Sequence, residues 1–252
     1  MRRAALSFFR FASSAALVGL VGIPRCARTN DAHAPREGPP PVAARGAIET
    51  VDVPGDERVL VVEGSARVQR PIVHLHGMCA DPRSDLDAWG AAAREHGTVI
   101  ALVGDVPCPD KPGTTKWTDD VEAIDARVVA AVGAVGVARA RSLDDAEILV
   151  VGSSMGAARA EALAKKNPSR YRRLVLVGSP RTPSPANLEG ASAVATLAGE
   201  REPQQMMRSG ARLLSEAGTP ARFWELPGAS HGEYGAEGAR IMSDAIAFVA
   251  TR

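Results

Sequence analysis

Hydrophobic and polar residues follow two different patterns along this chain. They alternate in AIETVDV (47–53) and in RVLVVEG (58–64), and the polar turn PGDE separates the two runs. Alternation with a period of two is typical of strands that bury one face, so this region predicts an antiparallel hairpin. Further along, unbroken apolar runs replace the alternation, which is typical of strands that are covered on both faces.

The apolar runs alternate with segments of helical pattern. We predict further strands at 71–77, 97–104, 146–152, 172–180, 191–200 and 220–228, and helices at 84–96, 119–140, 155–168, 204–217 and 237–251. Single helices between strands imply right-handed crossovers and a mostly parallel sheet. The predicted fold class is therefore α/β: a doubly wound, mostly parallel eight-stranded sheet with helices on both faces. In such sheets the active site lies beyond the carboxyl ends of the strands.

The beginning of the chain departs from this alternation. Residues 1–27 have a basic start and a short apolar run, which predicts an export signal or a membrane anchor; the alternative is a buried helix of the domain. Residues 28–46 are rich in Pro and Arg and predict a disordered linker. We therefore expect the folded domain over 47–252, in a protein that is periplasmic or secreted, with any membrane contact made through the N-terminal segment.

Composition narrows the range of partners. The net charge of the 252 residues is +1, which gives no electrostatic reason to expect a nucleic acid. The acidic run Asp81, Asp85 and Asp87 is too irregular for a calcium loop, and no His/Cys cluster has the spacing of zinc ligands. We expect neither a metal nor a cofactor, and the sequence does not predict an oligomeric state.

Two cysteines lie within the expected domain. Cys79 and Cys108 each follow a predicted strand, so both are expected near the same edge of the sheet. In an exported chain they either pair in a disulfide or stay as two separate buried thiols, and the sequence leaves both alternatives open.

The segment Gly152-Ser153-Ser154-Met155-Gly156 matches the pattern G-x-S-x-G. It lies where a predicted buried strand turns directly into a helix, and such a turn needs small flanking residues so that strand and helix can approach. The central serine is then exposed near a helix N-terminus, as a nucleophile requires. The alternative is a structural turn in which Ser153 or Ser154 caps the helix.

Two other loops at the same edge carry histidines. His76-Gly77-Met78 ends the strand at 71–77, and we expect the N–H groups of Met78 and Met155 to form an oxyanion hole, with His76 bracing the loop. His231-Gly232 follows the last strand, and an acidic segment, GEREP, precedes it in the chain. A serine, an acid and a histidine then occur in the order that nucleophilic catalysis by an activated serine allows.

Taken together, HGM, GSSMG, AGEREP and GASHG make residues 47–251 resemble the α/β-hydrolase superfamily. The resemblance implies that Ser154 is the nucleophile, His231 the general base and Glu202 the triad acid. Most members have Asp at the acid position, and this departure leaves Glu200 as an alternative to Glu202.

The chain offers fewer clues to the substrate. The segment after the strand at 172–180, SPRTPSPANLEGA, is too short for a helical cap, so we predict an open site without a large cap domain. Trp117 and Tyr234 are candidate substrate-binding residues; the alternative for Trp117 is a buried anchor of a surface loop.

These observations lead to one preferred hypothesis, an exported serine hydrolase that cleaves carboxylic esters of small molecules or polymer ends through an acyl-enzyme intermediate. A peptidase or acyltransferase of the same fold is an alternative, because the early chemistry is shared. A non-catalytic exported binding protein is the third hypothesis.

Overall fold

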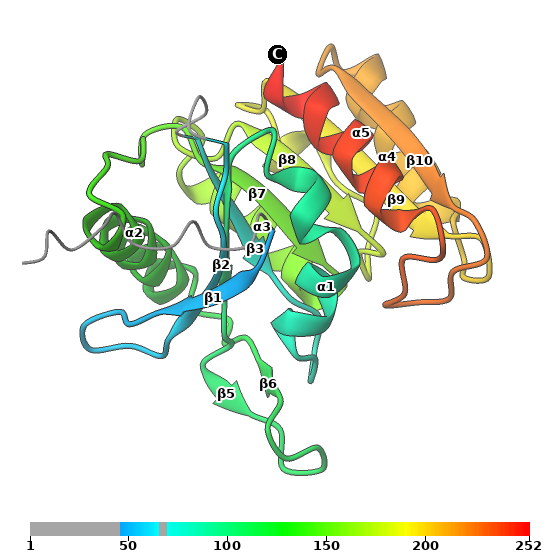
Figure 1. Ribbon diagram of the computed structural model, residues 1–252. Coiled ribbons are helices and arrows are strands. Elements are labelled where there is room, and N and C mark those ends of the chain that lie inside the picture. The colour runs from blue at the N-terminus through cyan, green and yellow to red at the C-terminus, as the bar shows by residue number, and fades with distance from the viewer. Residues whose placement is uncertain (1–45, 66–69) are drawn as a thin grey trace, which may run out of the picture. The chain divides into compact units, whose positions relative to one another are not determined.

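The computed structural model describes residues 46–65 and 70–252. These residues form an α/β domain around an eight-stranded sheet (Figure 1). The predicted export segment (1–27) and residues 28–45 of the predicted linker lie outside the described residues.

The sheet is mostly parallel. Its strands are β1 (Ile48–Val51), β2 (Val59–Val62), β3 (Pro71–Leu75), β4 (Thr98–Leu102), β7 (Leu149–Ser153), β8 (Arg173–Val177), β9 (Ala193–Gly199) and β10 (Ala221–Leu226). They lie in the order β1-β2-β4-β3-β7-β8-β9-β10. β1 and β2 form the predicted antiparallel hairpin, β2 is antiparallel to β4, and all other neighbouring strands are parallel. The predicted eight-stranded sheet is confirmed.

Helices cover both faces of this sheet. They are α1 (Pro82–Ala93), α2 (Val121–Ala138), α3 (Met155–Lys166), α4 (Gln205–Glu216) and α5 (Gly238–Ala250). α1 begins where the carboxylate of Asp81 accepts the N–H of Arg83, and α2 begins where that of Asp120 accepts the N–H of Ala123. α1 and α5 lie on one face, and α2, α3 and α4 lie on the other (Figure 1).

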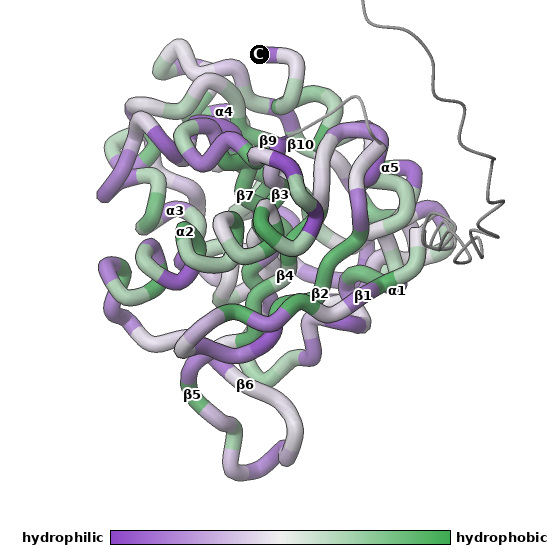
Figure 2. The backbone as a smooth tube through the Cα atoms, turned by 60° about the vertical axis from the view of Figure 1, so that its left-hand side comes forward, coloured by the Kyte–Doolittle hydropathy of each residue, from purple (hydrophilic) through white to green (hydrophobic). Residues whose placement is uncertain are grey.

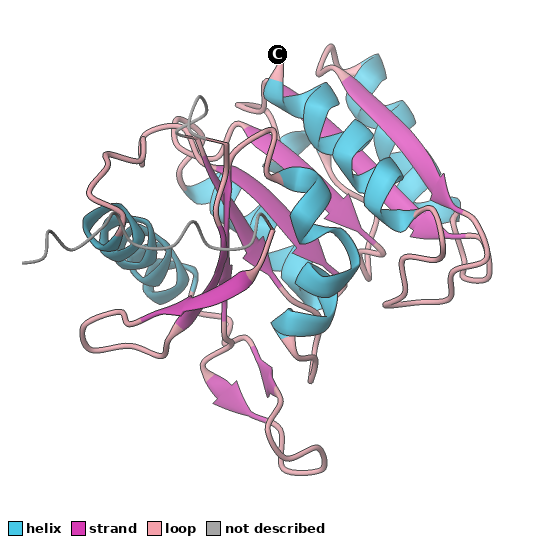
Figure 3. Cartoon of the chain, in the orientation of Figure 1, coloured by secondary structure: helices cyan, strands magenta, loops and turns pink. Residues whose placement is uncertain are grey.

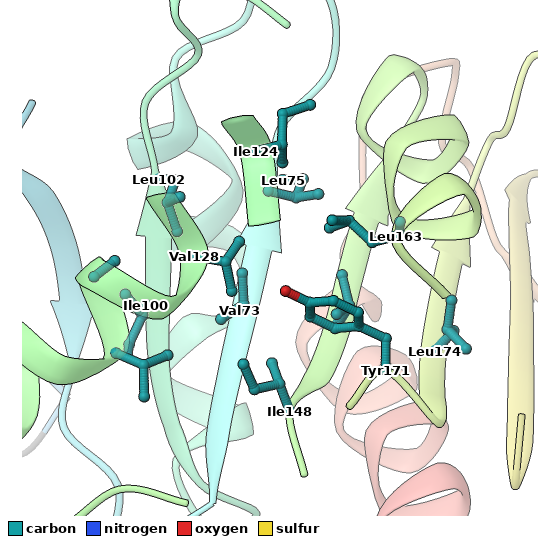
Figure 4. Packing of buried hydrophobic residues seen from close by; sticks show 14 of the residues in the cluster. Val73, Leu75, Ile100, Leu102, Ile124, Val128, Ile148, Leu163, Tyr171 and Leu174 are labelled. Carbon is teal, nitrogen blue, oxygen red and sulfur yellow. The ribbon is translucent and has the colours of Figure 1, made fainter. Parts of the chain in front are cut away.

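The two faces of the sheet bury two separate hydrophobic clusters. One contains Val73, Leu75, Ile100 and Leu102 of β3 and β4, packed against side chains that include Ile124, Val128, Leu163 and Tyr171 (Figure 4). The other packs alternate residues of the same strands against α1 and α5. Because both faces are covered, the central strands are mostly hydrophobic (Figure 2), although β3 also buries His74 and β9 buries Thr196.

One small element differs from the prediction. The segment between β4 and α2, for which the sequence predicts no strand, contains the two-residue strands β5 (Val106–Pro107) and β6 (Thr115–Lys116). They pair as an antiparallel ribbon (Figure 3). Strands this short have no hydrophobic periodicity to detect. A disulfide between Cys79 and Cys108 and a bridge between Ala80 and Thr115 join the ribbon to the loop after β3. Of the two alternatives for these cysteines, the disulfide is therefore the one formed.

The connections around the centre of the sheet determine where a cleft forms. β3 leads through α1 to β4 on one side, whereas β7 leads through α3 to β8 on the other side. The carboxyl ends of β3 and β7 are thus a topological switch point, where ligands bind in such sheets. Between β8 and β9 the described chain has one 3-10 turn, Pro185–Asn187, and no cap domain, as predicted.

Candidate active site

The nucleophile candidate lies on a sharp corner between β7 and α3. Ser154 has φ 50° and ψ −115°, a conformation that is strained for any residue except glycine. A Cβ atom added to Gly156 would lie 1.9 Å from the carbonyl oxygen of Leu75, and one added to Gly152 would lie 2.5 Å from the carbonyl oxygen of Gly156. Both glycines are therefore required for strand and helix to approach, as the pattern G-x-S-x-G predicts.

The three candidate triad side chains meet at this corner. Nε2 of His231 lies 3.0 Å from Oγ of Ser154, and Nδ1 lies 2.5 Å from Oε2 of Glu202. The other oxygen of Glu202, Oε1, accepts the backbone N–H of Gly199 at 2.7 Å, which holds the carboxylate in place. Glu200 points elsewhere, because its carboxylate accepts the N–H of Gly228. The structure thus brings Glu202, and not Glu200, to His231.

The histidine and its acid differ in exposure. The side chain of His231 is 54% exposed, so it can exchange protons with substrate and water, whereas the side chain of Glu202 is 10% exposed. An ionised carboxylate that is shielded from water interacts more strongly with the imidazolium that forms when His231 takes a proton. This is the electrostatic arrangement that a serine–histidine pair needs.

The glycine that follows β8 is a site residue that the sequence analysis missed. Gly178 has φ +55°, and a Cβ atom there would lie 3.1 Å from Cε1 of His231 and 3.4 Å from Oε1 of Glu202. Any larger residue would press on the histidine–carboxylate pair. The only sequence signal was a glycine at the end of a strand, where a turn alone is a sufficient explanation.

His76 braces the loop after β3. Its side chain is buried, its Nδ1–H donates to the carbonyl of Gly77 at 2.7 Å, and its Nε2 accepts the N–H of Gly104 at 2.9 Å. Burial lowers the pKa of His76 to about 4, so the ring is neutral at pH 7. The indole N–H of Trp117 donates to the carbonyl of His76 at 2.8 Å.

The two oxyanion-hole candidates come from two segments that meet at Ser154. Met155 is the first residue of α3, whose leading N–H groups have no acceptor within the helix. Met78 follows Gly77, where an added Cβ would lie 3.4 Å from Cβ of Ser154. No hydrogen-bond acceptor for the N–H of Met78 or Met155 is found within residues 46–65 and 70–252.

A small cleft of about 80 Å³ adjoins Ser154. Its lining consists of Gly77, Ala80, Ser84, Asp85, Ser153, Ser154, Val177, Gly178, Glu202, His231, Gly232, Glu233 and Tyr234. Tyr234 is thus at the cleft, although its hydroxyl is bonded to Ser153. Trp117 is not part of the lining and is 3% exposed, so it anchors its loop and does not form a wall of the cleft.

A second, wider cavity of about 590 Å³ lies between the turn that joins β1 to β2 and the β5–β6 ribbon. Asp56, Asp105 and Arg127 line it, and no triad residue does. Among the described residues we find no cluster of side chains that would hold a metal ion. Within the same residues, every helix is too short or too polar to cross a membrane.

Comparisons with known proteins agree with this architecture. No family model and no curated protein sequence matches the chain. Similar solved structures include a predicted CIB-like hydrolase from Thermoplasma acidophilum, with 17% identity, a TM-score of 0.55 and coverage of 82% of this chain and 98% of that one. Esterase PE8 has 18% identity and a TM-score of 0.58, and the alignment covers 75% of this chain and 97% of that one.

A third similar structure is that of FphF, a fluorophosphonate-binding serine hydrolase of Staphylococcus aureus, which was solved with its substrate bound. It has 13% identity and a TM-score of 0.56, over 81% of this chain and 97% of that one. Identities this low are evidence for the fold alone. Together with the strand order and the position of the corner serine, they show that the chain has an α/β-hydrolase fold.

Proposed function

We propose that this protein is a serine hydrolase that cleaves carboxylic esters through an acyl-enzyme intermediate. The observation that carries the proposal is the continuous chain of contacts from Ser154 through His231 to Glu202, at 3.0 and 2.5 Å. In this arrangement the serine can lose its proton as it attacks, the histidine can take that proton, and the carboxylate can stabilise the resulting charge.

The proposed reaction has two halves. Oγ of Ser154 bonds to the acyl carbon while its proton passes to Nε2 of His231, and the N–H groups of Met155 and Met78 stabilise the oxyanion. The intermediate collapses, the bond to the leaving oxygen breaks, and His231 gives the proton to the departing alcohol. Water then attacks the acyl-enzyme with the same histidine as base, which releases the acid and restores Ser154.

The cleft favours short acyl groups. Its volume of about 80 Å³ is well below the roughly 300–1,000 Å³ that is typical of pockets for drug-sized ligands. A formyl or acetyl group fits such a space, whereas a long acyl chain would have to extend over the open surface. The segment between β8 and β9 provides no cap to cover such a chain within the described residues.

Export is part of the proposal. Disulfides persist in oxidising compartments, and the bond between Cys79 and Cys108 supports the assignment of the chain to the periplasm or the exterior. The substrate is then a small molecule or a polymer end that the protein meets outside the cytoplasm.

Covalent labelling tests the proposal directly. We expect a fluorophosphonate probe to add to the purified protein once, at Ser154 by peptide mapping, and the protein to hydrolyse p-nitrophenyl acetate faster than the octanoate. Ser154→Ala should lose the adduct and about 10⁴-fold or more in kcat, because the nucleophile is absent. Ser84→Ala is the matched control, since Ser84 lines the same cleft but does not contact His231.

The outcomes separate the alternatives. Turnover of amides with no turnover of esters would favour a peptidase, and product transfer to added alcohols in preference to water would favour an acyltransferase. A folded protein that takes no label and turns over no ester, thioester or amide would overturn the proposal in favour of a binding protein.

A further inference from the structure

A second set of polar side chains lies buried at the cleft: Asp85, Ser153 and Tyr234 line it, and His74 contacts Asp85. Oη of Tyr234 is 2.9 Å from Oγ of Ser153, and Nε2 of His74 is 2.7 Å from Oδ2 of Asp85. Nδ1 of His74 faces the carbonyl of Val151 at 3.2 Å. His74 is 0% exposed, Tyr234 6%, and Asp85 and Ser153 7% each.

Burial of these groups has a free-energy cost that a hydrophobic floor would avoid. Removing hydroxyl, imidazole and carboxylate groups from water is unfavourable unless each finds a partner, and apolar residues of similar volume are often at least as stable. None of the four residues belongs to the triad. The reaction as proposed therefore does not explain why the cleft has a polar floor.

The positions of Ser153 and Tyr234 in the chain suggest the explanation. Ser153 immediately precedes the nucleophile Ser154, and Tyr234 lies three residues after His231. Their hydrogen bond joins the segment that carries the nucleophile to the segment that carries the base. Apart from the bond between Ser154 and His231 themselves, this is a direct side-chain link between the two segments.

The histidine loop needs such a link. Between β10 and α5 the chain has positive φ at Gly228, Gly232 and Gly235, and His231 is half exposed. Tyr234 is the large buried side chain of this loop, packed with Trp89 and residues of α5 in the cluster on that face of the sheet. Backbone contacts also hold this loop, such as the hydrogen bond from the N–H of Gly228 to Glu200. Tyr234 adds the aromatic ring whose hydroxyl reaches β7.

The phenol is suited to this role because it stays neutral. Burial raises the pKa of Tyr234 well above its ordinary value, and the charge of Asp85 raises it further. The O–H is therefore retained over the whole range in which an esterase works. Asp85, whose carboxylate lies 2.7 Å from Nε2 of His74, lines the same cleft as Tyr234.

We propose that Tyr234 is a positioning residue, which holds His231 at bonding distance from Ser154 through its hydrogen bond to Ser153, supported by Asp85 and His74. The inference rests on the proposed serine hydrolase function. It assigns Tyr234 a role different from the substrate-binding role expected from the sequence, because its polar atom is already bonded within the protein.

The test is a set of conservative variants measured on p-nitrophenyl acetate. Tyr234→Phe keeps the ring and removes the hydroxyl, and Ser153→Ala removes the partner. Each should lower kcat about 10- to 100-fold with little change in KM, since a small displacement of a catalytic group has effects of this size. The double variant should be no worse than the poorer single variant, because both remove the same interaction.

The chain provides a matched control in its other tyrosine. Tyr171 is also buried and its hydroxyl is bonded to Asp125, on the opposite face of the sheet from Tyr234. Tyr171→Phe loses a buried hydroxyl in the same way, and should lower the melting temperature while leaving kcat within twofold. The rate of fluorophosphonate labelling should fall in Tyr234→Phe in parallel with kcat, and not in Tyr171→Phe.

The opposite results would overturn the inference. If Tyr234→Phe raises KM at constant kcat and Ser153→Ala has no effect, Tyr234 binds substrate. If it changes only the melting temperature, as Tyr171→Phe does, the bond is merely structural. Failure of the wild-type protein to take the label would instead contradict the proposed function, so the two failures are distinguishable.

Discussion

Two loops at the same edge of the sheet contain the same dipeptide, and their histidines have different surroundings. His76-Gly77 follows β3, and His231-Gly232 comes shortly after β10. The ring of His76 is 0% exposed and bonded to backbone groups on two sides, whereas that of His231 is half exposed and bonded to a serine and a carboxylate.

The difference shows that partners and burial, more than the local sequence, decide what a histidine does. A buried ring without a carboxylate is held neutral and acts as a spacer between backbone segments. A ring that contacts a carboxylate on one side and a hydroxyl on the other can take up a proton and release it.

The largest effect is expected for the carboxylate that contacts His231. Glu202→Gln should lower kcat for p-nitrophenyl acetate by about 10³- to 10⁴-fold, because the amide no longer stabilises the imidazolium or fixes its tautomer. Glu200→Gln is the matched control, since Glu200 accepts only a backbone N–H from Gly228 and an amide oxygen can do the same. It should keep kcat within about twofold.

The contrary result would be a larger loss in Glu200→Gln than in Glu202→Gln. In that case Glu200 would be the triad acid in solution, and the contact between Glu202 and His231 would not be the catalytic one. Circular dichroism of both variants would show whether either loss reflects unfolding.

The sequence predicted most of the sheet because its signals are local. Unbroken apolar runs showed the buried strands, and the corner glycines Gly152 and Gly156 are needed for close approach whatever surrounds them. The choice between Glu202 and Glu200 depended on where a loop folds, and the sequence left it open. The burial of Trp117 and the approach of Gly178 to His231 depend on segments distant in the chain, so no local pattern could show them.

Removing the disulfide should affect the loop that carries His76 more than the loop that carries His231. Cys79 and Cys108 are 29 residues apart, and closing a loop of this length contributes about 3–4 kcal/mol to the free energy of unfolding. The double variant Cys79→Ser/Cys108→Ser should be less stable in urea by about that amount. We also expect its kcat to fall, because the disulfide holds the loop that carries Met78.

The matched measurement uses a reductant. Dithiothreitol should lower the stability of the wild-type protein to that of the double variant, and should leave the double variant itself unchanged. Equal stability of oxidised wild type and double variant would contradict the prediction and would mean that the ribbon of β5 and β6 is held by its other contacts alone.

The smallest effect is a dependence of stability on pH that we attribute to His76. Its pKa is about 4 in the folded protein, because the ring is buried, and its ordinary value in an unfolded chain is near 6.5. Between these values the unfolded state binds more protons than the folded state, so the free energy of unfolding decreases as the pH falls through this window. From pH 7.5 to 4.5 the loss due to this one residue should be about 2–3 kcal/mol.

A variant isolates this contribution from that of the carboxylates. His76→Gln keeps an acceptor and a donor but does not titrate, so urea unfolding should show a lower stability than wild type at pH 7.5 and a smaller loss on acidification, by about 2–3 kcal/mol. The carboxylates titrate in both proteins and cancel in the difference. Equal losses in the two proteins would mean that His76 is accessible to protons in the folded state. Burial would then no longer explain why His76 and His231 behave differently.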